Sequence, residues 1–458
     1  MMIRFLRCVF LFSTAFLMAE ESKTDVQQLI EDHTAFAMSF YNEITSADTS
    51  NSVFSPYSIS TALSMTYMGA RGDTADEIQS ALHLSLERNQ VGPAFLKLAE
   101  MLKEKSSNVK NDQLRIANAL WVDQRMFVLS DFTHEIESFF SGKVTRIHFA
   151  NKEKAIQTIN SWVSDQTEGK IQMLLQDGDL VDDTKLVLTN AMYFQGSWAF
   201  PFSLDKTVKS SFYPTPDEKT SILMMQQTKQ FELYENDLLQ MVALPFILET
   251  AVRDGKVMQG FESEPLSIGG AHSLMVKGPP IGKGSGSKDC VNLPSPTAVS
   301  RFMGSSDAKM ACVILLPKSA ENLPLIEGLL QGKFQEWLGS LTPQLVDLQL
   351  PKFSISQRMN LNETLKKLGM EIPFTAQANF AGIDGKLDLY LDKVITETFF
   401  ALDEAGVIAA AATAASIGVT ALPPVTPSHS FIANHPFLFF IVDLNSSEVV
   451  IMGNFTTP

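Results

Sequence analysis

Residues 405–427 form a long uncharged stretch of small side chains, AGVIAAAATAASIGVTALPPVTP. Glycine and β-branched residues weaken its helical tendency, alanine is a poor strand former, and the adjacent Pro423 and Pro424 end any regular structure. Strand-like runs lie on both sides of the stretch. We interpret a segment that fits no single conformation well as one built to move between two.

Three other interpretations of residues 405–427 are weaker. The stretch is long enough to cross a bilayer, but it has no flanking basic cluster and contains the proline pair. Flexible linkers are rich in glycine and serine, in proline or in charge, and a folded segment plainly follows this one. A buried alanine-rich helix agrees with the composition, and only the flanking sequence argues against it.

The bulk composition limits the class of protein. The chain has 458 residues, of which 45% are hydrophobic and 19% charged, so it can bury a large core. Its length alone suggests two or three domains. The formal net charge of −15 argues against nucleic-acid binding, because such binding depends on cationic contacts to phosphate.

The N-terminus has the pattern of a secretory signal peptide over residues 1–19. Two arginines precede an apolar run from 8 to 18 that is too short to span a membrane, and Ala19 is small enough for a cleavage position. We therefore expect a secreted, extracellular protein whose mature chain comprises residues 20–458.

Cysteine usage and glycosylation sequences agree with export. Cys8 lies in the signal peptide, and only Cys290 and Cys312 remain, so the chain is not a disulfide-framed scaffold. Cys312 is interpreted as an inert core thiol, with a bridge to Cys290 as the open alternative. The N-glycosylation acceptors are Asn362, Asn445 and Asn454, of which the second lies in a predicted hairpin turn.

The order of the elements predicts an α+β fold. Apolar residues at helical spacing predict several helices in the first third, the fourth of them over 93–105, and a further helix over 152–166. Nearly continuous apolar runs predict buried strands at 185–194, 437–444 and 449–455. Helices first and strands later, without βαβ alternation, favour large and mainly antiparallel sheets.

One region departs from this order. Residues 249–307 are rich in glycine, proline and serine, and they separate two predicted strands at 239–246 and 310–316. We interpret them as an irregular surface insertion. The Gly-Lys-Gly at 282–284 has the wrong spacing and context for a phosphate-binding loop.

Several motifs follow one another in a recognisable order: VFSPYSIS at 53–60, GARGDT at 69–74, INSWV at 159–163, NAMYFQGSW at 190–198, LPKF at 350–353 and HPFLF at 435–439. Together they resemble the serpin family of serine protease inhibitors, from about residue 24 to the C-terminus apart from the insertion. The resemblance implies a single serpin domain over 20–458. It also implies N-terminal helices, three mainly antiparallel sheets and an exposed reactive-centre loop at about 404–428.

By this resemblance, the start of the loop is a mobile hinge that enters a sheet as a new strand. In an extended strand neither face of residues 407–415 carries a charge, and their small side chains fit a nearly close-packed gap. About a dozen new ladder hydrogen bonds at roughly 1 kcal/mol each release on the order of 10 kcal/mol. The hinge residues that the family implies are Glu404, Gly406, Val407, Ala409, Ala410, Ala411, Ala412 and Thr413.

The energy released by insertion is expected to trap a protease. In the family the protease is still attached to the cut loop as an acyl-enzyme when insertion deforms it. Displacement of the oxyanion donors alone slows such chemistry by about 10²–10³. Deacylation then stalls, and the covalent complex persists.

The family spacing from the hinge glutamate places the scissile bond between Thr420 and Ala421, within one or two residues. Val419 and Leu422 are then protease subsite contacts. Because the site is small and apolar and lacks arginine or lysine, we expect an elastase-like serine protease as the target. If Leu422 is the residue that the protease reads, a chymotrypsin-like target is expected instead.

The resemblance also assigns a region where the sheet opens. Thr396 stands where many members carry a histidine, so the polar cluster of the family is kept only in part. This departure bears on how easily the sheet opens. The assigned residues are Ser55, Ser58, Asn190, Trp198 and Thr396.

The predicted function is a secreted, monomeric suicide inhibitor of serine proteases that needs no cofactor or metal and has no membrane span. The alternative is a non-inhibitory serpin that acts as a binding, carrier or chaperone protein. The small uncharged hinge favours inhibition, since non-inhibitory members usually interrupt it with bulky or charged residues. A hydrolase is disfavoured, because there is no Gly-x-Ser-x-Gly motif and the 7 histidines are scattered without metal-ligand spacing.

Overall fold

The computed structural model describes residues 23–47, 49–103, 113–246, 310–407, 427 and 429–458, with the backbone of two short strands between 252 and 257. Helices and large sheets make up this part of the chain, which confirms the predicted α+β class. The insertion at 249–307 lies outside the described residues except for these two short strands, and so does the loop from residue 408 to 426.

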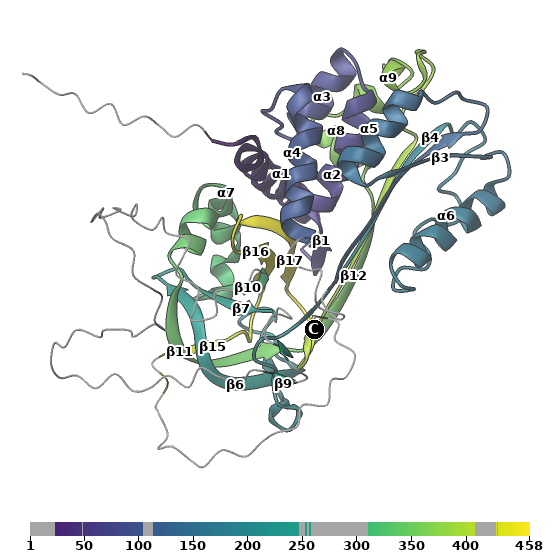
Figure 1. Ribbon diagram of the computed structural model, residues 1–458. Helices are drawn as coiled ribbons and strands as arrows, with labels where there is room; N and C mark the ends of the chain where they lie inside the picture. The colour runs from purple at the N-terminus through teal and green to yellow at the C-terminus, as the bar shows by residue number, and fades with distance from the viewer. Residues whose placement is uncertain are drawn as a thin grey trace, which may run out of the picture.

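The helices fall into groups along the chain. Helices α1 to α6 precede residue 167, and α7 to α9 follow residue 322 (Figure 1). Their bounds are α1 (Asp25–Ala47), α2 (Pro56–Gly69), α3 (Asp73–Ala81), α4 (Arg88–Lys103), α5 (Ser130–Phe140), α6 (Lys152–Gln166), α7 (Leu323–Gly339), α8 (Asn362–Lys367) and α9 (Ala381–Asp384).

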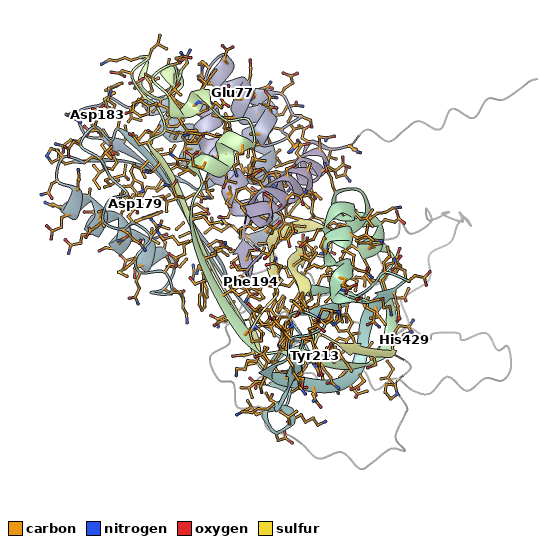
Figure 2. All side chains as sticks on the ribbon, turned by 180° about the vertical axis from the view of Figure 1, so that it is seen from behind. Glu77, Asp179, Asp183, Phe194, Tyr213 and His429 are labelled. Atoms are coloured by element: carbon orange, nitrogen blue, oxygen red, sulfur yellow. The ribbon has the colours of Figure 1, made fainter. Side chains whose placement is uncertain are left out.

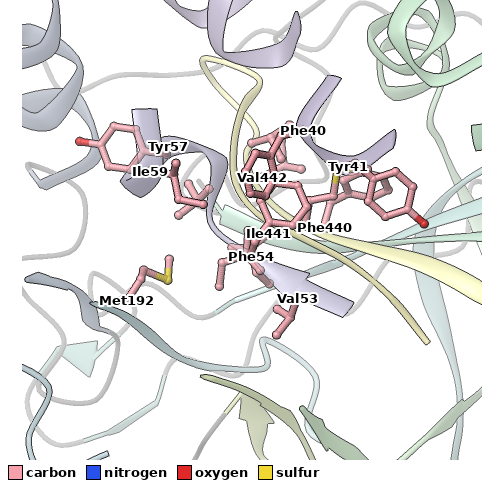
Figure 3. Close-up of a cluster of buried hydrophobic side chains, with 14 of the residues drawn as sticks. Phe40, Tyr41, Val53, Phe54, Tyr57, Ile59, Met192, Phe440, Ile441 and Val442 are labelled. Carbon is pink, nitrogen blue, oxygen red and sulfur yellow. The ribbon is translucent and has the colours of Figure 1, made fainter. Parts of the chain in front are cut away.

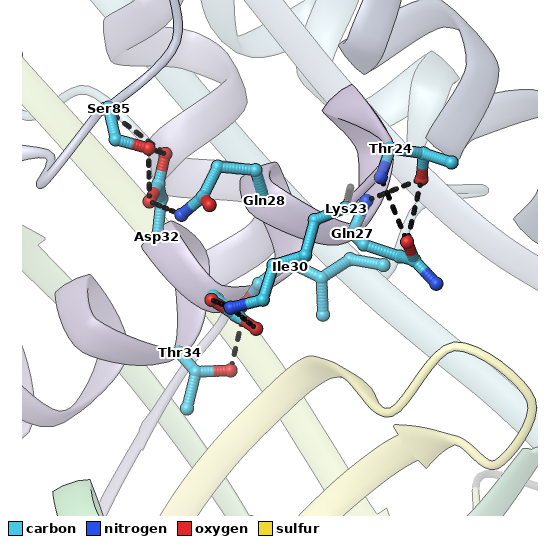
Figure 4. A network of polar contacts seen from close by, with 9 residues as sticks. Lys23, Thr24, Gln27, Gln28, Ile30, Asp32, Thr34 and Ser85 are labelled. Atoms are coloured by element: carbon cyan, nitrogen blue, oxygen red, sulfur yellow. Dashed lines mark hydrogen bonds and ion pairs between the residues drawn. The ribbon is translucent and has the colours of Figure 1, made fainter. Parts of the chain in front are cut away.

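Side chains at the start of α1 explain where this helix begins. The Thr24 hydroxyl accepts a hydrogen bond from the Gln27 amide at 3.3 Å, and the Gln27 side chain accepts one from the Thr24 amide at 2.9 Å (Figure 4). This reciprocal pair satisfies two donors that a helix end leaves free. About two turns into the helix, Asp32 accepts the Ser85 amide at 2.8 Å and fixes α1 to the chain before α4.

Helix α2 is buried along its whole length. Ser55 caps it by accepting the Ser58 amide at 3.1 Å, and Pro56 occupies the first turn, where its missing N–H is tolerated. Helix α4 begins at Arg88 and contains Pro93, so the predicted start at residue 93 was wrong. The proline removes one early hydrogen bond, and the burial of Phe95 and other apolar residues stabilises the helix around it.

Six strands form the sheet that positions the candidate site. Their order is β12-β13-β14-β4-β2-β3, and the pairs β13–β4 and β2–β3 are parallel. The bounds are β2 (Gln113–Asp123), β3 (Lys143–Ile147), β4 (Leu186–Ser197), β12 (Phe353–Asn360), β13 (Lys393–Leu402) and β14 (Gly406–Val407).

The second large sheet has nine strands, and all its pairs are antiparallel except β11–β15. Strand β6 is 16 residues long and pairs with β5, β7 and β11, so it joins into one path what the family resemblance led us to expect as two sheets. The strands are β1 (Ser52–Phe54), β5 (Val208–Phe212), β6 (Thr220–Glu235), β7 (Leu239–Pro245), β10 (Met310–Pro317), β11 (Thr342–Pro351), β15 (His429–Ile432), β16 (Phe437–Asp443) and β17 (Glu448–Phe455); β8 (Val252–Arg253) and β9 (Lys256–Val257) pair separately.

Two hydrophobic cores cover the two faces of the six-stranded sheet. The larger core joins α1, α2 and the nine-stranded sheet, and Figure 3 shows part of it, including Phe54, Ile59, Phe440 and Ile441. The smaller core lies on the other face, where α6 and the chain after it pack on β2, β4 and β13. Figure 1 shows α6 on the opposite side of the long strands from α2.

Candidate functional site

The candidate site is the junction between β4 and β13, which we call the seam. These two strands pair directly and in parallel from Lys393 to Phe399, with Thr396 opposite Asn190. At one end of the seam the chain leaves β13, turns and returns as β14 between the two strands. In β14, Val407 pairs with Gly196 on one side and with Leu402 on the other. The first residues of the predicted loop therefore already lie inside the sheet.

A short turn at residues 403–405 connects β13 to β14. The Asp403 carboxylate accepts the amides of Ala405 at 2.8 Å and Gly406 at 3.2 Å. Trp198 holds the turn from β4, because its indole N–H donates to the Asp403 carbonyl and its amide to the Ala405 carbonyl, both at 2.9 Å. An aspartate at the start of a turn commonly accepts such backbone donors.

Position 406 needs a glycine because the backbone of β14 lies very close to the backbone of β4. A Cβ atom at this position would lie 2.0 Å from the Gly196 carbonyl oxygen, well inside contact distance. The backbone of β14 can approach β4 only because this residue has no side chain. Val407, the next residue, is fully buried in the larger core.

Glu404 anchors the hinge to the body of the protein. Its side chain is 8% exposed, and it binds Lys352 Nζ at 2.6 Å and the Thr207 hydroxyl at 2.8 Å. Burial acts to raise the pKa of Glu404, but the hydrogen bonds from Lys352 and Thr207 outweigh it and hold the pKa below its ordinary value. The carboxylate is therefore ionised at neutral pH.

Aromatic packing supports the same end of the seam. The Trp198 ring stacks on Phe246 with centroids 5.0 Å apart and an angle of 9° between the planes. The Phe246 amide donates to the Met310 carbonyl at 3.0 Å. Phe246 and Met310, the described residues that precede and follow the predicted insertion, therefore lie next to each other, and Phe246 packs on Trp198 beside the hinge.

A buried polar cluster lies beneath the middle of the seam. The Asn190 amide group donates to Ser58 and, at 2.5 Å, to Asn118, while its carbonyl oxygen accepts the Thr396 hydroxyl at 2.6 Å. Thr396 and Asn190 belong to the two strands that must separate if a new strand enters. The Thr396 hydroxyl therefore hydrogen-bonds directly across the seam at the position where many members carry a histidine.

The structure separates the predicted site residues into two groups. Glu404, Gly406, Val407 and Trp198 meet at the end of the seam, while Ser58, Asn190 and Thr396 meet in its middle. Ser55 caps α2 and donates to the Val450 carbonyl at 2.7 Å. Outside the described residues lie Ala409, Ala410, Ala411, Ala412, Thr413, Val419, Thr420, Ala421 and Leu422.

Four residues of the site were missed by sequence reasoning: Lys352, Thr207, Asn118 and Asp403. The motif LPKF contains Lys352 and could have drawn attention to it, but its pairing with Glu404 follows only from the three-dimensional fold. The position of Asp403 next to Glu404 did not by itself indicate a turn.

The glycosylation acceptors differ in accessibility. Asn454 is 2% exposed, and its side-chain oxygen accepts the Ser52 amide at 2.7 Å. The Asn362 side chain donates to the Asp392 carbonyl at 2.8 Å and accepts the Val394 amide at 2.9 Å. Asn445 is exposed in the turn between β16 and β17.

Other site classes find little support in the described part of the chain. Its acidic residues, histidines and Cys312 form no group of three or more suited to a metal ion. Cys312 is buried in β10, and burial raises the pKa of its thiol, as expected for a core residue. Its predicted alternative partner, Cys290, lies outside the described residues. Of the described helices, none combines the length and apolarity that a bilayer crossing needs.

The geometry of a closed sheet with a strand beginning to enter it agrees with the family comparison. The model of the family described as Serpin (serine protease inhibitor) matches residues 31–256 and 302–458. The chain belongs to the serpin family, whose members are protease inhibitors in general and not enzymes, so the predicted family is confirmed. The internal stretch that the match leaves out, residues 257–301, falls within the predicted insertion.

Curated relatives align along nearly the whole chain. The leukocyte elastase inhibitor of Bos taurus is 30% identical over 444 residues, which cover 94% of this chain and 100% of that protein. Serpin B3 of Homo sapiens is 28% identical over 449 residues, with the same coverage.

Solved structures show the same fold. Serpin48 of the insect Tenebrio molitor, described as a highly specific serpin, superposes with a TM-score of 0.73 at 26% identity and covers 95% of this chain and 100% of that one. Human thyroxine-binding globulin complexed with thyroxine gives a TM-score of 0.74 with the same coverage, and at 23% identity this likeness concerns the fold alone.

Proposed function

We propose that this protein inhibits serine proteases by inserting its cleaved reactive loop into the seam between β4 and β13. The observation that carries the proposal is β14, a two-residue strand that already lies between them. The named elastase inhibitor among the relatives supports the inhibitory class. The small, uncharged side chains of residues 407–415 in this chain also support inhibition over a serpin that only binds a ligand.

The register of β14 defines how further residues would enter. Gly406 pairs with Ser197 and Val407 with Gly196, in antiparallel order. If the strand continues without a bulge, residues 408–417 fill the ten positions of β4 from Gln195 back to Leu186. Insertion of this length needs the seam to open by about 4.8 Å, the spacing of neighbouring strands.

The side chains of the inserting residues would alternate between the two hydrophobic cores on the faces of the six-stranded sheet. Val407 points into the larger core, so Ala409, Ala411 and Thr413 follow it on that face. By the same register Thr413 arrives opposite Asn190. Opening breaks the hydrogen bond from Thr396 to Asn190, and the incoming Thr413 hydroxyl can replace the lost donor. No charge has to be desolvated on either face.

The finer assignments belong to the same proposal. Cleavage between Thr420 and Ala421 leaves residues 408–417 free to insert, because they precede the cut. Small residues at the bond suit an elastase-like protease, or a chymotrypsin-like one if Leu422 is read. The signal sequence supports secretion, and the exposed turn at Asn445 supports glycosylation there.

The test is whether the protein forms a covalent complex with a protease. The mature protein is incubated with an elastase-like protease, and the products are separated on a denaturing gel and identified by mass spectrometry. We expect an adduct stable to heat and detergent, with a released C-terminal fragment that begins at Ala421. Cleavage without an adduct would support the non-inhibitory alternative.

A further inference from the structure

Residues 171–180 form a bridge over the seam on the face opposite α2. Ile171, Leu174, Leu175 and Leu180 pack there in the smaller core, together with Val187 and Ala191 of β4 and with Ile395 of β13. This core therefore spans both strands of the seam.

The bridge is attached to the β4 side by covalent and polar links. It connects the end of α6 to the start of β4, and α6 itself packs on β2. The Asn160 side chain in α6 donates to the Leu175 carbonyl and accepts the Leu175 amide, both at 2.8 Å. When the seam opens, these links hold the bridge with β4 and β2.

One residue ties the bridge to the opposite side. Arg358 belongs to β12, which pairs with β13 and forms the edge of the sheet beyond the seam. Its guanidinium donates to the Leu174 carbonyl through Nε and to the Asp179 carboxylate through Nη2. Asp179, which Figure 2 labels on the side of the molecule that carries α6, also accepts the Gln176 amide at 2.7 Å.

The contact is largely shielded from water. The Arg358 side chain is 22% exposed and that of Asp179 is 15% exposed. Charge-assisted hydrogen bonds in such surroundings are stronger than exposed ion pairs. A second carboxylate is within reach, because Glu397 of β13 lies directly opposite Arg358 in the β12–β13 register and interacts with it electrostatically.

We propose that Arg358 is a positioning residue that latches the closed sheet and slows loop insertion. This inference rests on the proposed function. An opening of about 4.8 Å moves β12 and β13 away from the bridge, so the contacts of Arg358 with Leu174 and Asp179 break before a strand can enter. Glu397 moves with Arg358 and remains as its partner after opening. The latch therefore stabilises the closed state and costs the inserted state little.

The test measures sheet opening without a protease. The full-length mature protein is incubated with a synthetic acetylated peptide that has the sequence of residues 404–417, and incorporation is followed by native gel and mass spectrometry. We expect R358Q and D179N to take up the peptide about tenfold faster than the wild type, the factor for losing one charge-assisted contact from the closed state. R358K keeps one charge and should be closer to the wild type.

The matched control is R115Q. Arg115 binds Glu168 at 2.9 Å and joins β2 to the chain just after α6, so this ion pair lies on one side of the seam. Its loss should leave the rate of peptide uptake unchanged. A second readout is urea unfolding, where R358Q should lower the midpoint of the intact protein but not that of the loop-cleaved, inserted form.

The outcomes separate the latch from the proposed function. Equal rates for the wild type, R358Q and D179N, or an equal loss of stability in the intact and cleaved forms, would refute the latch and leave the inhibitory mechanism standing. If the wild type neither takes up the peptide nor gains stability on cleavage, the sheet does not accept a strand, and both proposals are refuted.

Discussion

The anchor between Glu404 and Lys352 makes a quantitative prediction about the hinge. In Lys352→Gln, the carboxylate of Glu404, whose side chain is 8% exposed, loses its cationic partner and keeps the Thr207 hydroxyl. A hydrogen bond to a charged group contributes about 1.5–3 kcal/mol, and because Lys352 is 39% exposed we reduce this to about 1–2 kcal/mol. Because the unfolding entropy grows with chain length, a chain of this size should lose about 1–2 °C in melting temperature at neutral pH.

The same contact predicts a dependence on pH. The folded pKa of Glu404 lies below its ordinary value of 4.5. The ionised pair therefore stabilises the protein fully above that value, and the stabilisation is lost as the pH falls through the folded pKa. The difference in melting temperature between the wild type and Lys352→Gln should thus shrink on acidification below pH 4.5.

Thermal unfolding from pH 7 down to pH 3.5 tests both statements. The double variant with Glu404→Gln serves as the control, since it also removes the carboxylate and should recover part of the lost stability. A melting temperature unchanged at pH 7, or a difference that persists undiminished at pH 3.5, would show that the ion pair does not hold the hinge.

Two further substitutions test other parts of the site, and one expression experiment tests the glycosylation acceptors. Gly406→Ala should destabilise the intact protein by about 1–3 kcal/mol in urea unfolding, because its Cβ would lie 2.0 Å from the Gly196 carbonyl; an unchanged midpoint would mean that β14 is not held there. Thr396→Val removes the donor to buried Asn190 and should cost the closed state about 1–3 kcal/mol, with faster peptide uptake; slower uptake would contradict this role. Expression in a secretory host should add a glycan at Asn445 and none at Asn454, which peptide mass spectrometry can decide.

Local sequence patterns predicted helices and strands well where a single feature, such as a proline or a continuous apolar run, marks the element. The proline after Ser55 marked the start of α2, and the continuous apolar run near residue 190 marked β4. At α4, burial of the apolar face outweighed the interruption by Pro93. The start of this helix was therefore misplaced.

The polar partners at the site could not be predicted from single motifs. Lys352 and Glu404 meet because they lie just beyond the paired ends of β12 and β13, where Phe353 is opposite Leu402, and this pairing brings together residues far apart in the sequence. Asn118 joins the cluster at Asn190 because β2 lies next to β4, which no local pattern records. Arg358 likewise has a partner far away in the chain, on the segment after α6.

The two-residue strand β14 has a kinetic consequence. Bringing distant chain segments together costs closure entropy before any contact is gained, and here that nucleation step is complete in the resting molecule. In the proposed mechanism, the cleaved loop then only has to extend this strand, one residue pair at a time. Under that proposal, the insertion rate depends on how fast β4 and β13 separate, and the ratio of this rate to the rate of acyl-bond hydrolysis decides whether the protease is trapped or released.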